Sequence, residues 1–500
     1  MMAALLGRAQ HSVALVDPKP EGAWPNNYGS WREEWESLAA SLQMPELLDC
    51  VATHWAMTDC FFGGSFDMPD DERLRLDRAY LKVDRLKFKA LLQEKHAAAS
   101  VQLLEGYVAA ENIAPNLFDK GLVHDASGST LTVASTKGGD DLRVRAKLVV
   151  DATGFESKLT VRESPASGGL WKELTPGYQI AYGMCVDVER DERIAPYDMG
   201  AMTLFDYRTD HLVGTDLLAD AEERPSFVYV MPSGGDEGGD GGRVSAFFEE
   251  TSLVGRGERR LEFETLKRRL IRRLAFHGIE YDEASVREEE YCYIPMGGTL
   301  PDMSQRVVPI GGAANTVHPA TGYQLCRALA AAPDLSGALG RALRQSPDPD
   351  RAARAAYAAV WSRQASLQRE FALFGGEFLM TLDAEALRGW FAGFFALDEE
   401  VWGGFLAGWR GLPGNHHHES RAARLLFGLS LVPKLPPPVT LKLASFILEY
   451  SLKHGGALMR SLTPFFGDGA YFSEDAAPPG SPRQVGDAAV KAEIRARVGG

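Results

Sequence analysis

Three short apolar segments of this 500-residue chain each run into a turn that can hold a ligand. A short apolar run bounded by a turn is typical of a buried strand. Glycine in such a turn lets the backbone approach a ligand closely, and a helix after the turn offers unpaired N–H groups and a positive dipole end. Three such signals, in this order and at these separations, predict an α/β core that binds a flavin. The segments are residues 11–17 (HSVALVD), 147–155 (KLVVDATGF) and 307–323 (VVPIGGAANTVHPATGY).

The first segment ends in Asp17. In a dinucleotide-binding βαβ unit, the acid that ends the second strand hydrogen-bonds the adenosine ribose, whereas the alternative for Asp17 is an ordinary strand end. Residues 1–10 (MMAALLGRAQ) look like the last turns of the helix that precedes this strand. Neither a strand nor a GxGxxG turn comes before them, so we expect the chain to lack the N-terminal strand and glycine turn of its own fold.

The other two segments place glycines where strands end. Gly154 follows one strand, and Gly311 and Gly312 follow the other. A tight turn after a core strand is the alternative to a ligand site. The second glycine pair leads into a predicted helix over 324–332, whose first turn suits a flavin carbonyl or phosphate.

Two adjacent carboxylates, Glu249 and Glu250, end a further predicted strand over 244–248 (VSAFF). Successive strand side chains point to opposite faces, so one Glu shares a face with Phe247 and the other does not. Taken alone, both acids are expected to be solvated, because ionised carboxylates are costly to bury. The flavin signals around them favour a buried, functional pair instead.

Composition narrows the function classes. A net charge of −15 argues against nucleic acid and against simple electrostatic attraction to anionic lipid. The five cysteines are scattered without CxxC spacing, which supports neither a disulfide framework nor a zinc site. No apolar run is long enough for a clear membrane span, and no targeting peptide is evident. The histidine run 416–418 sits in a predicted loop, and we assign it no role and predict no metal.

Beyond these features, the sequence resembles the plant and algal type of lycopene cyclase, and is related to lycopene β-cyclase. The resemblance spans roughly residues 11–335 in order, and it continues more weakly through 391–395 and 427–431. Many co-linear motifs are more specific than any single one. The segments that carry it are 16–18 with 24–29 (WPNNYG), 83–85 (VDR), 151–155 (DATGF), 176–183 (PGYQIAYG), 205–208 (FDYR), 227–232 (FVYVMP), 247–254 (FFEETSLV), 294–298 (IPMGG) and 311–323.

The resemblance implies a flavoprotein that cyclises the ψ end groups of lycopene, through γ-carotene, without net redox change. It implies reduced FAD with NAD(P)H as reductant, a plastid location, a membrane surface and other carotenoid-pathway enzymes as partners. Glu249 falls on the position that the family needs for activity, with Glu250 beside it. The remaining residues implied are Asp17, Arg85, Asp151, Gly154, Gly311, Gly312, Thr321 and Gly322 for the cofactor, and Tyr178, Asp206, Phe247 and Phe394 for the substrate.

This chemistry agrees with the residue types. Cyclisation starts when an acid protonates an isolated alkene, and the resulting cation must be shielded from water. A glutamate buried among phenylalanines has a raised pKa and holds a proton at neutral pH. Glu249 is therefore the predicted acid or charge partner, and Glu250, on the opposite face, is expected to orient the strand.

The predicted organisation is a Rossmann-like flavoprotein fold of α/β (α+β) class with an inserted antiparallel sheet and a helical C-terminal region. A core interrupted by an inserted sheet gives discontinuous domains. We predict a FAD domain at 1–50, 75–165 and 290–335, a substrate sheet at 166–290, a helical region at 350–465 and a disordered tail at 473–500.

Several alternatives remain open at this level. Segments 371–380, 390–409 and 425–432 are either interfacial helices or core helices that line a carotenoid tunnel. Within the family, the alternatives are an ε-cyclase or a paralogue that rearranges epoxy-carotenoids. Two alternatives belong to other functional classes. One is an FAD-dependent oxidoreductase, such as a prenyl reductase or monooxygenase, and the other is a non-catalytic carotenoid-binding relative.

Overall fold

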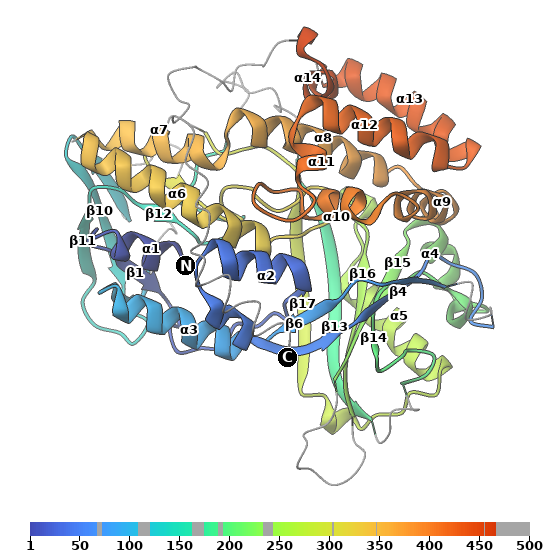
Figure 1. The fold of residues 1–500 in the computed structure, drawn as a ribbon. Helices are drawn as coiled ribbons and strands as arrows, with labels where there is room; N and C mark the ends of the chain where they lie inside the picture. Colours follow the sequence, from blue (N-terminus) through green and yellow to red (C-terminus); the bar gives the residue numbers. More distant parts are fainter. Residues whose placement is uncertain are drawn as a thin grey trace.

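The structure is a computed structural model, and its described residues form five β-sheets and a thick layer of helices (Figure 1). Helix α6 and the helices after it cover one side of the sheets, whereas α5 lies against the other side of the largest sheet. The residues described are 1–67, 73–108, 121–162, 175–188, 194–233, 244–302, 305–346, 348–454 and 456–466. The predicted disordered tail and the glycine-rich stretch 234–242 lie outside them.

The three strand-and-turn segments of the sequence take part in two parallel strand pairs, one of which is completed by β7. Strand β1 (Ala14–Asp17) follows helix α1 (Met2–Arg8) and pairs with β7 (Gln102–Glu105), and β12 (Val150–Asp151) pairs with β18 (Val308–Pro309). Parallel pairing is typical of βαβ units, which confirms the predicted α/β fold.

Helix α6 (Leu325–Gln345) is longer than the predicted helix, and it continues past Pro333. The proline removes one intrahelical hydrogen bond, but Leu335 and Leu339 after it are buried, and their burial offsets that loss.

Two smaller sheets flank these pairs. One has three antiparallel strands in the order β2 (Gly29–Trp31), β6 (Tyr80–Val83) and β3 (Val51–Trp55). Helix α2 (Arg32–Ser41) follows β2, and α3 (Arg85–Ala98) follows β6 with Asp84 as its N-cap. The other sheet comprises β8 (Tyr107–Val108), β9 (Leu122–Asp125), β10 (Gly128–Ala134) and β11 (Leu142–Ala146).

The largest sheet has seven strands in the order β17-β13-β16-β15-β14-β4-β5. All neighbours are antiparallel except β14 and β4. Two strands come from before residue 80, so the sheet is not confined to the range predicted for it, and the domain division stays a prediction. The strands are β4 (Met57–Phe61), β5 (Leu74–Leu76), β13 (Gly177–Val188), β14 (Ala201–Asp206), β15 (Ser226–Ser233), β16 (Val244–Ser252) and β17 (Glu288–Met296).

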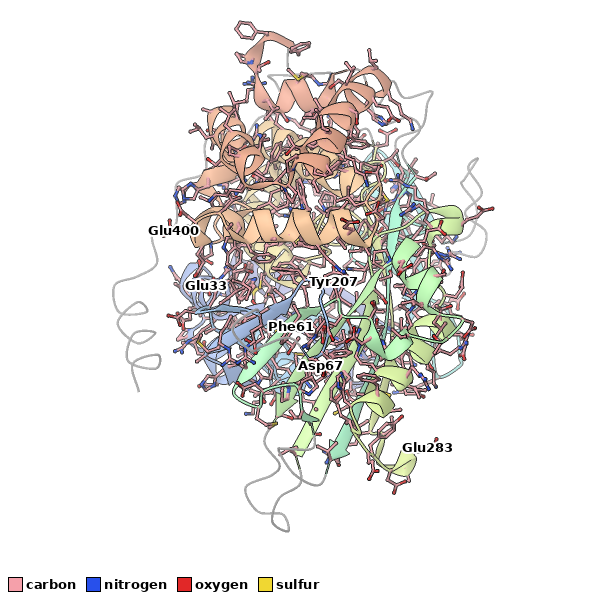
Figure 2. All side chains as sticks on the ribbon, turned by 90° about the vertical axis from the view of Figure 1, so that its right-hand side faces the viewer. Glu33, Phe61, Asp67, Tyr207, Glu283 and Glu400 are labelled. Atoms are coloured by element: carbon pink, nitrogen blue, oxygen red, sulfur yellow. The ribbon has the colours of Figure 1, made fainter. Side chains whose placement is uncertain are left out.

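Each face of this sheet is buried against helices. On one face, Leu266 and Leu270 of α5 (Phe263–Phe276) pack with Phe248 of β16. On the other, Phe247 belongs to a large aromatic core shared with the C-terminal helices. Figure 2 shows these helices stacked above the sheets. They are α7 (Pro349–Val360), α8 (Arg363–Leu379), α9 (Ala384–Phe395), α10 (Glu399–Ala407), α11 (His416–Glu419), α12 (Arg421–Leu431), α13 (Pro437–Lys453) and α14 (Ala457–Leu462); the short α4 (Leu218–Glu223) contacts α9.

Candidate active site

Strand register brings Glu249 next to a second carboxylate, Glu290. Glu249 on β16 lies opposite Gly183 of β13, and Gly183 lies opposite Glu290 of β17. Residues directly opposite each other on antiparallel strands point to the same face of the sheet. The two acids therefore share the face that meets the helical layer, with a glycine between them.

Gly183 leaves the room that this arrangement needs. A Cβ atom at this position would lie 2.5 Å from Cζ of Phe247 and 3.3 Å from Cγ of Glu249. The first distance is far below ordinary van der Waals contact, so any larger residue would push Phe247 or Glu249 away. The absent side chain lets the Glu249 side chain reach across the middle strand toward Glu290.

A thiol and two asparagines complete the cluster. The ligand atoms of Glu249, Glu290 and Cys292 all lie within 4.8 Å of one another. Asn26 Nδ2 donates to Glu290 Oε1 at 3.0 Å, and the backbone N–H and Nδ2 of Asn27 donate to Oε2 at 3.0 and 2.9 Å. These asparagines belong to the WPNNYG motif, so a distant loop holds Glu290 in place.

Burial raises the pKa of Glu249 to about 8, and repulsion from Glu290 adds to this shift. A hydrogen bond of 2.9 Å from the Thr251 hydroxyl to Glu249 Oε1 opposes it in part. Glu249 therefore carries a proton at neutral pH. This state suits a general acid, because its pKa lies close to the working pH.

Aromatic side chains and one amine surround the acid on this face. Tyr229 of β15 lies opposite Glu249, and its ring packs edge-on against Tyr80. The Lys82 ammonium lies 5.5 Å from the centre of the Phe247 ring, and burial lowers the pKa of this lysine. Phe394, on α9, belongs to the same aromatic core as Phe247.

Glu250 lies on the opposite face, in a network of buried charges. Its Oε1 accepts a hydrogen bond of 2.6 Å from Ser226, and its Oε2 lies 3.4 Å from Nε of Arg273 on α5. Arg273 also approaches Asp206 at 3.4 Å, and Arg208 donates to Asp206 at 2.8 and 2.9 Å. The arginines hold the pKa of Asp206 below its ordinary value. These contacts fix β16 to α5.

Two residues predicted for the substrate are not brought near Glu249. Asp206 belongs to the buried charge network just described. Tyr178 alternates with Gly183 along β13, so it faces the other way, and its ring stacks on Tyr293 at 4.3 Å. Phe247 lies on the same face of β16 as Glu249, and Phe394 belongs to the aromatic core on that face.

The glycine turns predicted for the cofactor meet at the ends of β12 and β18. Gly154 has φ +97°, and apart from its chain neighbours no described residue has an atom within 4 Å of the position that its Cβ would occupy. A Cβ on Gly312 would lie 3.1 Å from the backbone nitrogen of Phe155, so the two turns touch. Gly311 also has a positive φ, of +57°. Near this junction, Gln324 at the start of α6 has a buried side-chain oxygen without a hydrogen-bond donor among the described residues. An open glycine cradle beside a free acceptor fits a flavin.

The remaining cofactor candidates differ in what they face. Asp151 is buried and accepts hydrogen bonds from its own loop, from Thr153 at 2.9 and 2.7 Å and from Thr160 at 2.5 Å. It therefore shapes the turn rather than facing a ligand. The Thr321 hydroxyl donates to the Leu406 carbonyl at 3.2 Å.

The last two cofactor candidates, Asp17 and Arg85, lie near the N-terminal segments and not at the glycine turns. Asp17 ends β1, and its carboxylate accepts the N–H of Lys19 at 2.8 Å. Arg85 pairs with Glu288 and donates to the Pro25 carbonyl at 3.0 Å. Arg85 is thus placed beside the Asn26–Asn27 loop.

The glycine turns and the acid pair border the same sheet face. A Cβ on Gly322 would lie 2.8 Å from the side-chain oxygen of Gln179. Gln179 and Gly183 are four residues apart on β13 and share a face, a separation of roughly 13 Å. A ligand between them would be bounded by the cofactor turns at one end and by Glu249 at the other.

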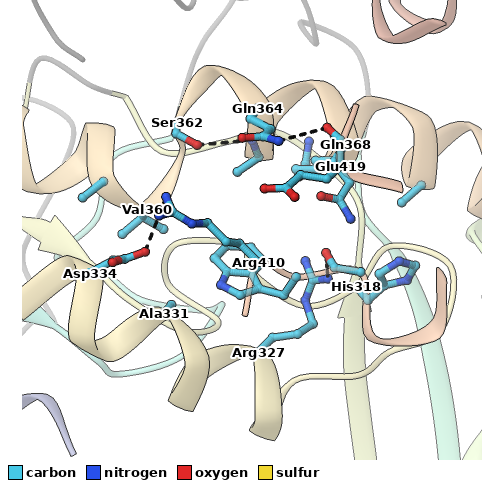
Figure 3. Close-up of a pocket in the computed structure, with 16 residues that line it drawn as sticks. His318, Arg327, Ala331, Asp334, Val360, Ser362, Gln364, Gln368, Arg410 and Glu419 are labelled. Carbon is cyan, nitrogen blue, oxygen red and sulfur yellow. Dashed lines mark hydrogen bonds and ion pairs between the residues drawn. The ribbon is translucent and has the colours of Figure 1, made fainter. Parts of the chain in front are cut away.

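A separate pocket lies between α6, α7 and α8 (Figure 3). Its lining mixes polar side chains, which include His318, Arg327 and Arg369, with apolar ones such as Val360 and Trp409. Arg327 donates to the Thr316, Ala407 and Gly408 carbonyls at 2.7 to 2.9 Å, so its guanidinium joins α6 to the end of α10. The pocket does not contain Glu249 or Glu290.

The sequence pattern missed Glu290, Cys292 and Asn27. Two signals for these residues are present in the sequence. In the run EEEYC (288–292), Glu288, Glu290 and Cys292 occupy alternate positions, and the motif WPNNYG contains the two asparagines. Neither run shows that its residues lie near Glu249, because that contact depends on the order of the strands in the sheet.

Comparison with known proteins gives a consistent result. The family model described as lycopene cyclase protein matches residues 1–413. The chain is 34% identical over 433 residues to the chloroplastic/chromoplastic lycopene beta cyclase of Capsicum annuum, covering 86% of this chain and 74% of the relative. It is 33% identical over 457 residues to the chromoplastic capsanthin/capsorubin synthase of Citrus sinensis, covering 88% and 79%.

Solved structures share the fold at low sequence identity. A geranylgeranyl bacteriochlorophyll reductase-like protein from Thermoplasma acidophilum has a TM-score of 0.53 at 13% identity, covering 89% of this chain and 95% of that one. A mutant of the halogenase PltM, solved in complex with FAD, has a TM-score of 0.52 at 13% identity, covering 90% and 93%. These likenesses confirm the predicted fold class, and the sequence matches show that the chain belongs to the lycopene cyclase family.

Proposed function

We propose that this protein is an FAD-dependent lycopene β-cyclase, an isomerase that closes the ψ end groups of lycopene and γ-carotene into β rings. The observation that carries the proposal is the placement of Glu249, whose pKa is raised, beside Glu290 on the sheet face that also borders the glycine turns. The names of the family and of its relatives supply the substrate.

Glu249 would donate its proton to the terminal double bond of the ψ end group, which forms a tertiary cation. The neighbouring double bond attacks that cation and closes the ring, and loss of a ring proton to a carboxylate restores neutrality. One proton enters and one leaves, so the product is an isomer of the substrate. The rings of Phe247 and Tyr229 present π faces that stabilise positive charge and exclude water.

Glu290 would set the protonation of its partner. Three N–H groups of Asn26 and Asn27 donate to the Glu290 oxygens and hold this side chain beside Glu249. Two close carboxylates cannot both ionise cheaply, which keeps one of them an acid near pH 7. Glu250 would hold β16 in place through Ser226 and Arg273, and we propose no catalytic role for it.

The cofactor would lie along Gly154, Gly311, Gly312 and Gly322, with Asp17 toward its ribose. Reduced FAD held there, with NAD(P)H as its reductant, would supply negative charge to the site without net redox change. The open space at Gly154 and the free oxygen of Gln324 support this placement. Asp151 and Thr321 would hold the turns, because their side chains already bond to protein atoms.

A hydrocarbon substrate requires contact with a membrane surface, and the outer helices offer one. Among the described residues, no helix combines the length and the apolar character that a bilayer span requires. Most of segments 371–380 and 390–409 is packed in the core, whereas α12 and α13 expose leucines. Leu429, Leu441 and Leu452 are 62%, 72% and 78% exposed. Large exposed apolar side chains on outer helices suit interfacial binding.

The test is Glu249→Gln in cells that accumulate lycopene, compared with Glu289→Gln as a matched control. Glu289 lies on β17 but points to the other face, where it bonds to Tyr182 and Lys267. We expect β-carotene to disappear with the first variant and to persist with the second. Undiminished β-carotene with Glu249→Gln would refute the assignment.

The plastid location of the named relatives leads us to propose that this protein works in the same compartment, beside other carotenoid-pathway enzymes.

A second candidate is rearrangement of epoxy-carotenoids, favoured by the likeness to capsanthin/capsorubin synthase. The same acid could protonate an epoxide oxygen instead of an alkene. Supplying the purified protein with both substrate types and analysing the products separates the two functions. Analysis of ring type in the same assay separates β from ε cyclisation, and NAD(P)H consumption in step with product would indicate an oxidoreductase.

A further inference from the structure

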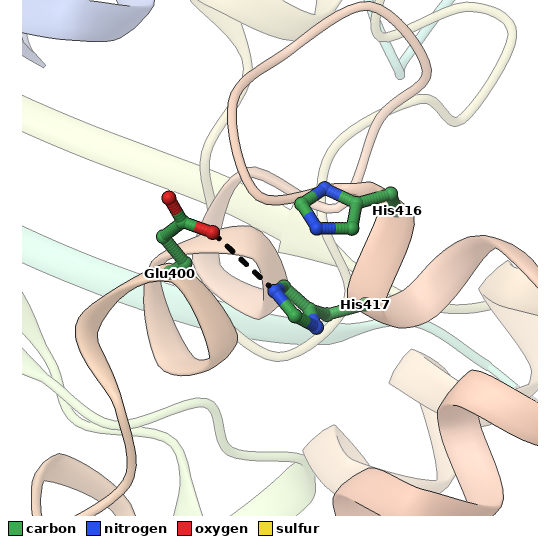
Figure 4. Close-up of side chains that lie close together, drawn as sticks. All are labelled: Glu400, His416 and His417. Carbon is green, nitrogen blue, oxygen red and sulfur yellow. Dashed lines mark ion pairs between the residues drawn. The ribbon is translucent and has the colours of Figure 1, made fainter.

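The histidine run, to which the sequence gave no role, meets a carboxylate in the folded chain. His416 and His417 of α11 lie beside Glu400 of α10, and Figure 4 shows the three side chains converging. Nε2 of His417 lies 3.5 Å from Oε2 of Glu400. One ligand atom from each of the three residues lies within 4.8 Å of the other two.

The backbone beneath this cluster is firmly held. The neighbouring His418 is buried, and its Nε2 hydrogen-bonds the Val401 carbonyl at 2.7 Å, which joins α11 to α10. Gly404 and Gly414 pack backbone to backbone, since a Cβ on Gly404 would lie 2.1 Å from the Gly414 carbonyl oxygen. The first turn of α10 and the start of α11 are therefore fixed relative to each other, whereas the three outer side chains remain accessible.

The three groups match the ligands that zinc takes in proteins. Zn²⁺ binds imidazole nitrogen and carboxylate oxygen at roughly 2.0–2.2 Å, so two ligand atoms of a tetrahedral site lie about 3.4 Å apart. The 3.5 Å between His417 and Glu400 already has this value. The Glu400 side chain is 77% exposed, so small rotamer changes can bring the third atom in.

We propose that Glu400, His416 and His417 form a site for a divalent transition metal, with Zn²⁺ as the expected ion and water in the fourth position. Two imidazoles and one carboxylate favour such metals over Mg²⁺ and Ca²⁺, which prefer oxygen ligands. The bound ion would clip α10 to α11. Helix α10 carries Trp402 and Phe405 into the aromatic core, so the clip would stabilise the layer that covers Glu249.

The experiment is calorimetric titration of the full chain, prepared without a histidine tag and stripped with a chelator, with ZnCl₂ and separately with MgCl₂. We expect one equivalent of Zn²⁺ to bind, and both Glu400→Gln and His417→Gln to weaken binding by at least about tenfold. His54→Gln is the control, because His54 is an exposed histidine on β3 and is not one of the three proposed ligands. It should bind Zn²⁺ as the unaltered chain does.

Three results would overturn the proposal. The first is no Zn²⁺ binding by the unaltered chain, which would leave an ordinary His417–Glu400 ion pair. The second is equal affinity in Glu400→Gln and the unaltered chain, since the carboxylate would then not be a ligand. The third is loss of Zn²⁺ binding in Glu249→Gln with retention in His417→Gln, which would place the ion at the other group of potential ligands, Glu249, Glu290 and Cys292.

Discussion

Replacing Glu249 by glutamine should stabilise the fold increasingly as the pH rises. Glu249 has a pKa of about 8 in the folded protein, against 4.5 for an unperturbed glutamate. Between these values the folded chain keeps a proton that the unfolded chain loses, so the free energy of unfolding falls as the pH rises. Below pH 4.5 both states are protonated and this penalty vanishes. Glutamine does not titrate, so the penalty is absent from the variant.

The size of the effect follows from the shift. Each pKa unit corresponds to about 1.4 kcal/mol, so Glu249 costs on the order of 3 kcal/mol at pH 7 and about 5 kcal/mol above pH 9. Urea unfolding of the unaltered chain and of Glu249→Gln, at intervals from pH 5 to pH 9, measures the difference directly. The variant should be the more stable protein at pH 8, although it has lost activity.

Glu289→Gln serves as the control for the same series. Hydrogen bonds from Tyr182 and Lys267 lower the pKa of Glu289, so its contribution is present at neutral pH and is lost on acidification. This variant should gain no stability between pH 5 and pH 9. A stability difference for Glu249→Gln that stays flat with pH would refute the view that Glu249 is a partly buried, protonated acid.

Three further results are expected. Glu290→Gln should lower the pKa of Glu249, because it removes a neighbouring negative charge. In the urea series, the fall in the free energy of unfolding that Glu249 causes should then level off at a lower pH. An unchanged pH profile would contradict the acid pair. Gly183→Ala should cost about 1–3 kcal/mol in urea unfolding and impair cyclisation, since the new Cβ meets Phe247; unaltered stability and activity would contradict the need for this gap. Leu441→Ser with Leu452→Ser should weaken recovery with liposomes in flotation while leaving the unfolding midpoint unchanged; full recovery would exclude this face.

Local patterns in the sequence predicted the strands and turns well. Strands appear close to residues 11–17, 147–151 and 307–310, because apolar runs before glycine or aspartate are governed by neighbouring residues. Strand alternation also separated Glu249 from Glu250, and the structure places them on opposite faces.

Contacts between distant segments were not predictable in the same way. Glu290 meets Glu249 only because β13 lies between β16 and β17, and nothing local specifies that strand order. The motif around Tyr178 indicated membership of a family but not which face the ring occupies. Glu400 lies sixteen residues before His416, so only the fold shows that the histidine run has a carboxylate partner.

The buried charges behind β16 restrict how substrate can reach the acid. Glu250, Arg273 and Asp206 join this strand to α5, and separating them would leave ions unpaired in the interior. The backbone of β16 beside Glu249 is therefore tied to α5, and we expect it to hold its position when a substrate binds. We therefore expect the movement that admits a substrate to occur in the C-terminal helices over this face, and not in the sheet.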